Sequence, residues 1–162
     1  MKIYPQKINA QNFAPYGKTY NLKDGTEGVS VYKTQTFTDR MIEMSSFGEG
    51  KVHFGMTEGS PLPCVVKSME IHPTTEEAIL CIGEPIILCV APWEGKEFPS
   101  SSSVEAFELR DGQIAVLGKN VWHDACHGIE RPTRYCWFAK ACPEGLGWVN
   151  VDEELRLEFK EE

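Results

Sequence analysis

Two of the four histidines lie beside carboxylates at spacings that suit proton transfer or metal binding. In the segment 64–72, alternation along a strand places Ser68, Glu70 and His72 on one face, with apolar residues between them. The Cα atoms of Glu70 and His72 lie about 6.6 Å apart at ordinary strand rise, so both side chains can reach one ion or substrate atom. Glu76 follows after a tight turn, and we expect it to join them from the returning strand.

A second stretch, residues 112–127, repeats this scheme with a strand, a Gly and Asn turn, and His123 just beyond it. The spacings of the two stretches resemble the two motifs of the cupin superfamily. The resemblance places His72, Glu76 and His123 in three of the four usual metal-ligand positions. Glu70 stands where the motif has its first histidine.

A closer resemblance is to the ureidoglycolate lyase family, through short matches that follow in order along nearly the whole chain. The matching segments are Phe13–Gly17, Gly59–Pro63, His72–Pro73, Asn120–His123 and Cys142–Trp148. The resemblance implies a cupin barrel, usually dimeric, that cleaves ureidoglycolate to glyoxylate and urea in purine-ring catabolism. The chain departs from the family pattern at Lys119, Asp124 and Ile71, where the pattern has an arginine, a histidine and a basic residue.

Under this resemblance each candidate residue has an expected role. His72 and His123 transfer protons or bind a metal ion, Glu76 orients or ligates, and Glu70 is the remaining metal ligand. Lys119 binds the carboxylate of an anionic small-molecule substrate, ahead of the other nearby cations Lys67, Arg131 and Arg134. Two histidines with carboxylates accept Mn, Fe, Ni or Zn, and the sequence does not choose among these ions.

Two other functions stay open at this point: a metal-dependent isomerase or epimerase of a sugar or sugar acid, and a non-catalytic cupin that binds a small metabolite. His127 is expected at the pocket mouth, because an extended chain would carry it about 13 Å from His123. His53 is expected on a strand face, and the aromatic rings of Trp122, Tyr135 and Trp137 are expected to fill the barrel.

These side chains need strands to position them, and the sequence favours an all-β fold. Short apolar runs separated by Gly, Pro, Ser or Asp indicate strands. The expected strands are 51–57, 64–72, 77–82, 85–91, 104–109, 113–117 and 133–139. We predict a single-domain cupin-type antiparallel β-barrel, or jelly roll, over residues 1–162, with one or two short helical turns.

Within this domain we expect an N-terminal segment 1–49, a barrel core over about 50–140, and an acidic C-terminal strand and tail over 148–162. Residues 9–16 can form a short helical turn that Pro15 ends. Residues 99–103 read as a flexible surface loop, and the alternation near the C-terminus suggests an edge strand.

Composition excludes several classes of function. The 162 residues carry a formal net charge of −8, which disfavours a nucleic-acid partner. No secretory signal or membrane-spanning run is visible, so we expect a cytoplasmic protein that works on a small molecule, as a homodimer under the family resemblance. The six cysteines form no C-x-x-C pair and are expected to be reduced core residues.

Overall fold

The computed structural model describes residues 1–23, 26–44, 49–141 and 147–160. Over these residues the chain is built from short strands and a single 3₁₀ turn, η1 at Ser101–Ser103. No helix among them is long and apolar enough to cross a bilayer. The strands are β1 (Lys2–Ile3), β2 (Gln6–Lys7), β3 (Gly17–Asn21), β4 (Val29–Lys33), β5 (Thr38–Ile42), β6 (Val52–Gly59), β7 (Cys64–Ile71), β8 (Glu77–Cys81), β9 (Ile86–Pro92), β10 (Glu105–Leu109), β11 (Gln113–Leu117), β12 (Val121–His123), β13 (His127–Gly128), β14 (Thr133–Lys140) and β15 (Val149–Leu157).

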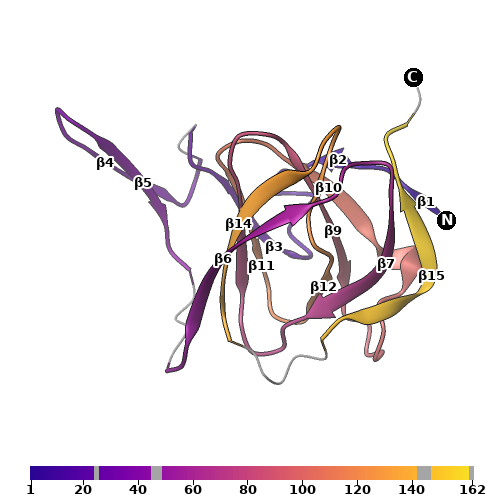
Figure 1. Cartoon of the computed structure of the whole chain (residues 1–162). Coiled ribbons are helices and arrows are strands. Elements are labelled where there is room, and N and C mark those ends of the chain that lie inside the picture. Colours follow the sequence, from indigo (N-terminus) through magenta and orange to yellow (C-terminus); the bar gives the residue numbers. More distant parts are fainter. Residues whose placement is uncertain (24–25, 45–48, 142–146, 161–162) are drawn as a thin grey trace.

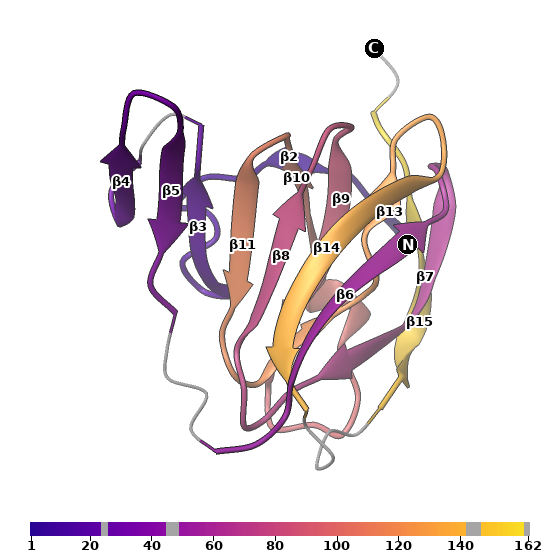
Figure 2. The same cartoon turned by 60° about the vertical axis from the view of Figure 1, so that its left-hand side comes forward.

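Two sheets face each other and curl around a common interior (Figures 1 and 2). The larger sheet runs in the order β1-β15-β7-β12-β9-β10-β2, and β13 also pairs with β9. The smaller sheet runs β3-β11-β8-β14-β6. Strands from the N-terminal 21 residues therefore join both sheets, with β1 and β2 in the larger sheet and β3 in the smaller.

Strand β9 shows how the core is organised, because its residues from Ile86 to Ala91 are all buried. Ile86, Leu88 and Val90 pack between the two sheets, with Phe13 and Phe107 as the large aromatic fillers. The alternate residues of β9 pack into a second apolar cluster on the other face of the larger sheet; its members include Ile71, Ile87, Cys89, Ala91, Trp122, Leu155 and Leu157. A strand buried on both faces reads as a continuous apolar run, which is the pattern of residues 85–91.

The seven strands expected between residues 51 and 139 are all present, and their ends agree with the prediction to within two residues. The hairpin of β4 and β5 was not anticipated. Among the described strands β4 and β5 pair only with each other, and the hairpin projects away from the barrel (Figure 1). Its residues are mostly exposed, so it lacks the alternation of buried and polar positions by which a strand is recognised.

Two expectations about chain ends and loops are wrong. Residues 99–103 are not a flexible surface loop, because Pro99, Ser100 and Ser101 are buried and the Ser101 amide donates a 2.7 Å hydrogen bond to the carboxylate of Asp152. The C-terminal strand β15 is not at the edge of its sheet. The short strand β1 covers it in parallel register, with Ile3 opposite Leu157.

The cysteines behave as apolar residues where the structure describes them. Cys64, Cys81, Cys89, Cys126 and Cys136 are free, and burial raises the pKa of the Cys89 and Cys126 thiols well above the ordinary value. Such thiols are poor nucleophiles. Cys142, the first residue of one segment used for the family resemblance, lies outside the described residues.

Candidate active site

The site begins where β7 and β12 run side by side in the larger sheet. Glu70 and His123 stand directly opposite each other in this antiparallel pair, and Ile71 stands opposite Trp122. Ile71 and Trp122 point into the second apolar cluster, so Glu70 and His123 point to the other face, toward the interior between the sheets. The turn before β12 contains Asn120 in the left-handed conformation (φ 61°), which asparagine tolerates better than most residues.

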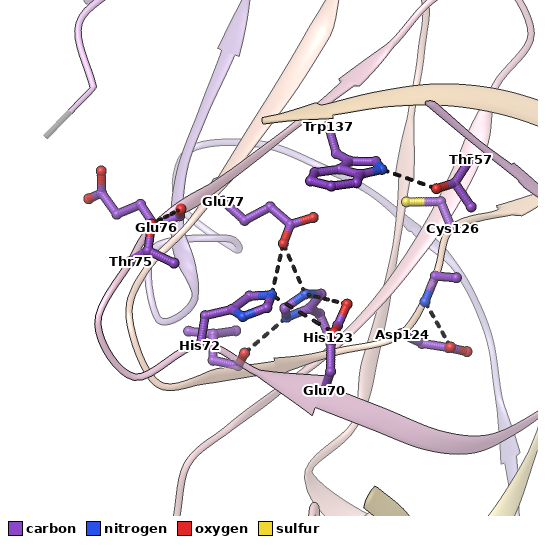
Figure 3. A network of polar contacts seen from close by, with 12 residues as sticks. Thr57, Glu70, His72, Thr75, Glu76, Glu77, His123, Asp124, Cys126 and Trp137 are labelled. Atoms are coloured by element: carbon purple, nitrogen blue, oxygen red, sulfur yellow. Dashed lines mark hydrogen bonds and ion pairs between the residues drawn. The ribbon is translucent and has the colours of Figure 1, made fainter. Parts of the chain in front are cut away.

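His72 and Glu77 complete the cluster from the chain that crosses to the smaller sheet. His72 follows β7 directly, and its carbonyl accepts a 3.1 Å hydrogen bond from the amide of Asn120. Glu77 is the first residue of β8 and stands opposite Ala139 of β14. Its side chain points at the two imidazoles (Figure 3).

Glu76 was expected in this position, and that expectation is wrong. Figure 3 shows its carboxylate pointing away from the imidazoles, on the opposite side of the chain from that of Glu77. The chain turns through Pro73 and Thr75 before β8 starts at Glu77. Neighbouring residues of a strand face opposite ways, so the register that pairs Glu77 with Ala139 of β14 turns Glu77 inward and Glu76 outward.

The four side chains of this cluster, Glu70, His72, Glu77 and His123, converge closely. The Nε2 atom of His72 lies 3.1 Å from Oε2 of Glu77 and 4.0 Å from Oε2 of Glu70. The Nε2 atom of His123 lies 3.4 Å from Oε2 of Glu77 and 3.6 Å from Oε1 of Glu70. His123 and Glu77 are the more buried pair, with side chains 4% and 10% exposed, whereas His72 and Glu70 are 20% and 28% exposed.

His123 is oriented by its own strand. Its Nδ1 lies 3.1 Å from the carbonyl oxygen of Val121, and a carbonyl only accepts, so Nδ1 carries the proton of that hydrogen bond. Its Nε2 is buried and has no hydrogen-bond partner in the described part of the chain. A histidine held by one ring nitrogen, with the other aimed at carboxylates, is arranged as metal-binding histidines are.

The carboxylates and imidazoles shift one another's pKa values against the effect of burial. Burial raises the pKa of Glu77, but the imidazoles of His123 and His72 beside it outweigh burial and lower the value to about 2. Burial lowers the pKa of His123, but Glu70 and Glu77 outweigh it and raise the value to about 10. The metal-free cluster therefore holds an ionised Glu77 beside a protonated His123 near neutral pH.

The same atoms fit a divalent metal ion. One nitrogen or oxygen atom from each of the four residues lies within 4.8 Å of those from the others. Ligand atoms around a tetrahedral ion with bonds of about 2.1 Å lie about 3.4 Å apart, which is close to the separations found here. Two imidazoles and two carboxylates are donors that divalent transition metals accept. The cluster can therefore hold a metal ion.

The cluster lies in the wall of a cavity of about 560 Å³ between the sheets. Lys119 does not line this cavity. It is exposed in the turn before β12, so the structure does not bring the expected carboxylate-binding lysine into the site. Lys140, the last residue of β14, does line it. The other lining residues are His53, Thr57, Ile79, Asp124, Ala125, Tyr135, Trp137, Ala139, Ala141 and Trp148.

The remaining histidines and aromatic residues lie only partly where the sequence led us to expect them. His127 is buried apart from the cluster, with Nε2 3.0 Å from the carboxylate of Asp124. His53 is exposed on β6, as expected, but also lines the cavity. Trp122 fills the core, whereas Tyr135 and Trp137 face the cavity as well as the core.

Glu77 and Lys140 are the site residues that the sequence reasoning missed. Glu77 shares its strand face with Ile79 and Cys81, which belong to the core between the sheets. The shared face of residues 77, 79 and 81 could have indicated that Glu77 points inward. This indication was weak because Ala78 and Leu80 on the other face are also apolar.

Comparison with known proteins adds a family match and structural neighbours. The family model described as ureidoglycolate lyase matches residues 1–158. No curated protein matches the chain. RmlC from Streptococcus suis, solved with dTDP-D-xylose, aligns with a TM-score of 0.53 at 10% identity, over 86% of this chain and 72% of that one. The Mycobacterium tuberculosis RmlC epimerase aligns with a TM-score of 0.48 at 10% identity, over 87% of this chain and 68% of that one.

At such low identity the likeness to the Streptococcus suis protein concerns the fold alone. It agrees with the two curled sheets described above, and the predicted cupin-type β-barrel is confirmed. The family match covers nearly the whole chain and includes every residue of the cluster.

Proposed function

The chain belongs to the ureidoglycolate lyase family, and on that premise we propose that it cleaves ureidoglycolate to glyoxylate and urea at the cluster of Glu70, His72, Glu77 and His123. The observation that carries this proposal is the cluster itself. It places two carboxylates and two imidazoles in the wall of a cavity large enough for the substrate, and each imidazole has one buried nitrogen without a hydrogen-bond partner in the described part of the chain.

The proposed reaction is an elimination from a carbinolamide. A base removes the proton of the substrate hydroxyl, the oxygen electrons form the carbonyl of glyoxylate, and the C–N bond breaks with its electron pair going to nitrogen. An acid then protonates that nitrogen, which leaves as urea. The net change moves one proton from oxygen to nitrogen, so a single carboxylate that takes and returns the proton suffices.

We assign that carboxylate to Glu70. It is the most exposed member of the cluster, and its oxygens lie farther from the imidazoles than those of Glu77 do. His72, Glu77 and His123 would then hold a metal ion as a set of two histidines and one carboxylate, a donor set that leaves coordination positions open. Mn, Fe, Ni and Zn all accept it. When bound, such an ion supplies Lewis-acid polarisation of the substrate oxygens.

The substrate carboxylate needs a positive partner in the cavity. We place it toward Lys140, which takes over the role expected of Lys119. The structure gives Lys140 no ion pair with a carboxylate of the described residues. A charge-assisted contact to a free carboxylate is stronger than a neutral hydrogen bond, and it orients the substrate relative to Glu70.

The test combines metal analysis with urea release from ureidoglycolate in wild type, Glu70→Gln and His123→Ala. We expect Glu70→Gln to keep its metal and to lose about 10²- to 10⁴-fold in kcat, as removal of an acid–base group does. His123→Ala should lose both metal and activity. The lyase proposal fails if the wild type releases no urea above the spontaneous rate. The assignment of Glu70 fails if Glu70→Gln keeps the wild-type kcat.

We also propose that the protein is a cytoplasmic homodimer, of which the family resemblance implies the dimer. The hairpin of β4 and β5 supports a self-association surface, because Val31, Tyr32 and Met41 are 51% to 58% exposed on it. An isolated two-stranded hairpin is only marginally stable in water, and a second copy would cover it. Analytical ultracentrifugation checks this. A species of twice the 18.2 kDa chain mass is expected, and a monomer at all concentrations would contradict it.

A further inference from the structure

The cavity is larger than the proposed substrate requires. Ureidoglycolate has about nine non-hydrogen atoms, and even at the share of one water molecule in the liquid, about 30 Å³ each, these fill about 270 Å³. The cavity has about 560 Å³, a size at which pockets take drug-sized ligands. Roughly half of the space is therefore left beside the reacting group.

The spare space is bordered by an aromatic wall, which we define as Trp137, His53 and Trp148. The rings of His53 and Trp137 meet edge to face, with centroids 6.5 Å apart. Trp148 lines the same cavity and is 52% exposed. The wall is close to the cluster, because Trp137 stands opposite Ile79 while Glu77 stands opposite Ala139 on the same pair of strands. Such diagonal neighbours lie about 7–8 Å apart.

Trp137 is held rigidly in this wall by two features of β6. Gly55 stands opposite Trp137, and a Cβ atom at Gly55 would lie 2.3 Å from the indole ring, so the ring occupies the space that a side chain would fill. The indole Nε1 donates a 3.1 Å hydrogen bond to the hydroxyl of Thr57 (Figure 3). The indole N–H is already hydrogen-bonded and the position of the ring is fixed, so a ligand in the cavity can interact with the indole only by packing against its ring.

From this arrangement we propose that the aromatic wall is a second subsite, which binds a planar apolar group attached to the outer nitrogen of the ureido unit. This inference rests on the proposed function and names its substrate class: 2-hydroxy-2-ureido acids with a planar N-substituent. The negative face of an aromatic ring disfavours a carboxylate and favours a flat, uncharged group. The substrate hydroxyl therefore lies toward the cluster, its carboxylate lies toward Lys140, and the outer ureido nitrogen points to the wall.

The subsite can be tested without turnover by NMR titration of the protein with urea and with phenylurea. We expect phenylurea to bind the wild type at least about tenfold more tightly than urea, and Trp137→Leu to reduce this ratio to less than threefold. Trp93→Leu is the matched control, because Trp93 is 54% exposed and does not line the cavity. It should keep the wild-type ratio. Gly55→Ala should also reduce the ratio, because its Cβ displaces the indole while the tryptophan remains.

A wild type that binds urea and phenylurea with similar affinity overturns the subsite, and so does a folded Trp137→Leu that keeps the wild-type ratio. Circular dichroism confirms that each variant is folded. The catalytic arm compares kcat/KM for N-phenylureidoglycolate and ureidoglycolate. A wild type that cleaves neither compound but binds phenylurea more tightly refutes the lyase proposal and leaves the subsite standing.

Discussion

Substitution of Glu77 by glutamine provides a direct test of the cluster, and Glu76→Gln is its matched control. Both changes remove one negative charge and keep the size of the side chain, at adjacent positions. Glu77 is buried, with its Oε2 3.1 Å from Nε2 of His72 and 3.4 Å from Nε2 of His123. Glu76 is half-buried and lies outside the cluster.

The expected loss of stability in the metal-free protein is large. Removing one partner of a buried ion pair costs about 3–5 kcal/mol, because the other charge stays buried without compensation. In a chain of 162 residues this lowers Tm by about 6–20 °C. Glu76→Gln should change the free energy of unfolding by about 1 kcal/mol or less, because Glu76 lies outside the cluster and is still partly exposed to solvent.

The pH dependence follows from the two opposite pKa shifts. The pKa of His123 rises from 6.5 to about 10 on folding, so its contribution is fully present below pH 6.5 and is lost as the pH rises toward 10. The pKa of Glu77 falls from 4.5 to about 2, so its contribution is present above pH 4.5 and is lost as the pH falls toward 2. The two pKa shifts arise from the same interaction between Glu77 and His123, so their contributions to the free energy of unfolding are not added together. The penalty of Glu77→Gln should be greatest between about pH 4.5 and 6.5.

The assay is urea unfolding in the presence of a chelator at pH 5.5, 8 and 10. The reasoning is refuted if Glu77→Gln is as stable as Glu76→Gln at pH 5.5. It is also refuted if the difference between the two variants does not shrink toward pH 10. A metal titration of both variants completes the test, and only Glu77→Gln should show a reduced affinity.

Three further predictions concern the substrate, the metal and the backbone. Lys140→Met should raise KM for ureidoglycolate at least tenfold while Lys119→Met leaves it unchanged, and equal effects in steady-state kinetics would remove Lys140 from the site. The pKa of His123 is raised to about 10, so metal binding near pH 7 should release protons. Calorimetry in buffers of different ionisation enthalpy should detect these protons, and a binding enthalpy that does not depend on the buffer would contradict the prediction. Gly59→Ala should lower the free energy of unfolding by more than about 3 kcal/mol, because its Cβ would lie 1.7 Å from the Cys126 carbonyl oxygen. Gly118→Ala is the control: the nearest atom to its Cβ is 3.5 Å away, so it should cost about 1 kcal/mol or less. Chemical denaturation measures both, and similar losses would show that the backbone yields at Gly59.

Local patterns in the amino-acid sequence predict most strands of the barrel. Each predicted strand from residue 51 to 139 is a short apolar run between turn-forming residues, and such runs form strands wherever a second layer can cover them. The hairpin of β4 and β5 was not predicted because its strands are mostly exposed. Strands without a buried face do not show the alternation of apolar and polar residues. Burial of the segment 99–103 also depends on a distant residue, Asp152, whose carboxylate binds the Ser101 amide.

The two histidines of the cluster were predictable for the same local reason. Ser68, Glu70 and His72 share one face of β7 because side chains alternate along any strand. His123 follows a turn that ends in Asn120, and the spacing of that turn resembles a known motif. The direct opposition of Glu70 and His123 across β7 and β12 needed the register of two strands far apart in the sequence.

The all-β architecture, the family resemblance and a pocket shared by His72 and His123 follow from local patterns in the chain. The glutamate and the lysine that accompany the two histidines depend instead on how distant strands pair. A shift of one residue in the register of β8 against β11 and β14 exchanges the faces of Glu76 and Glu77. Both faces of β8 carry apolar residues, so the amino-acid pattern does not reveal the register. Lys140 reaches the cavity because β14 ends at its rim, a position set by pairing with β6 and β8 rather than by any neighbour in the chain.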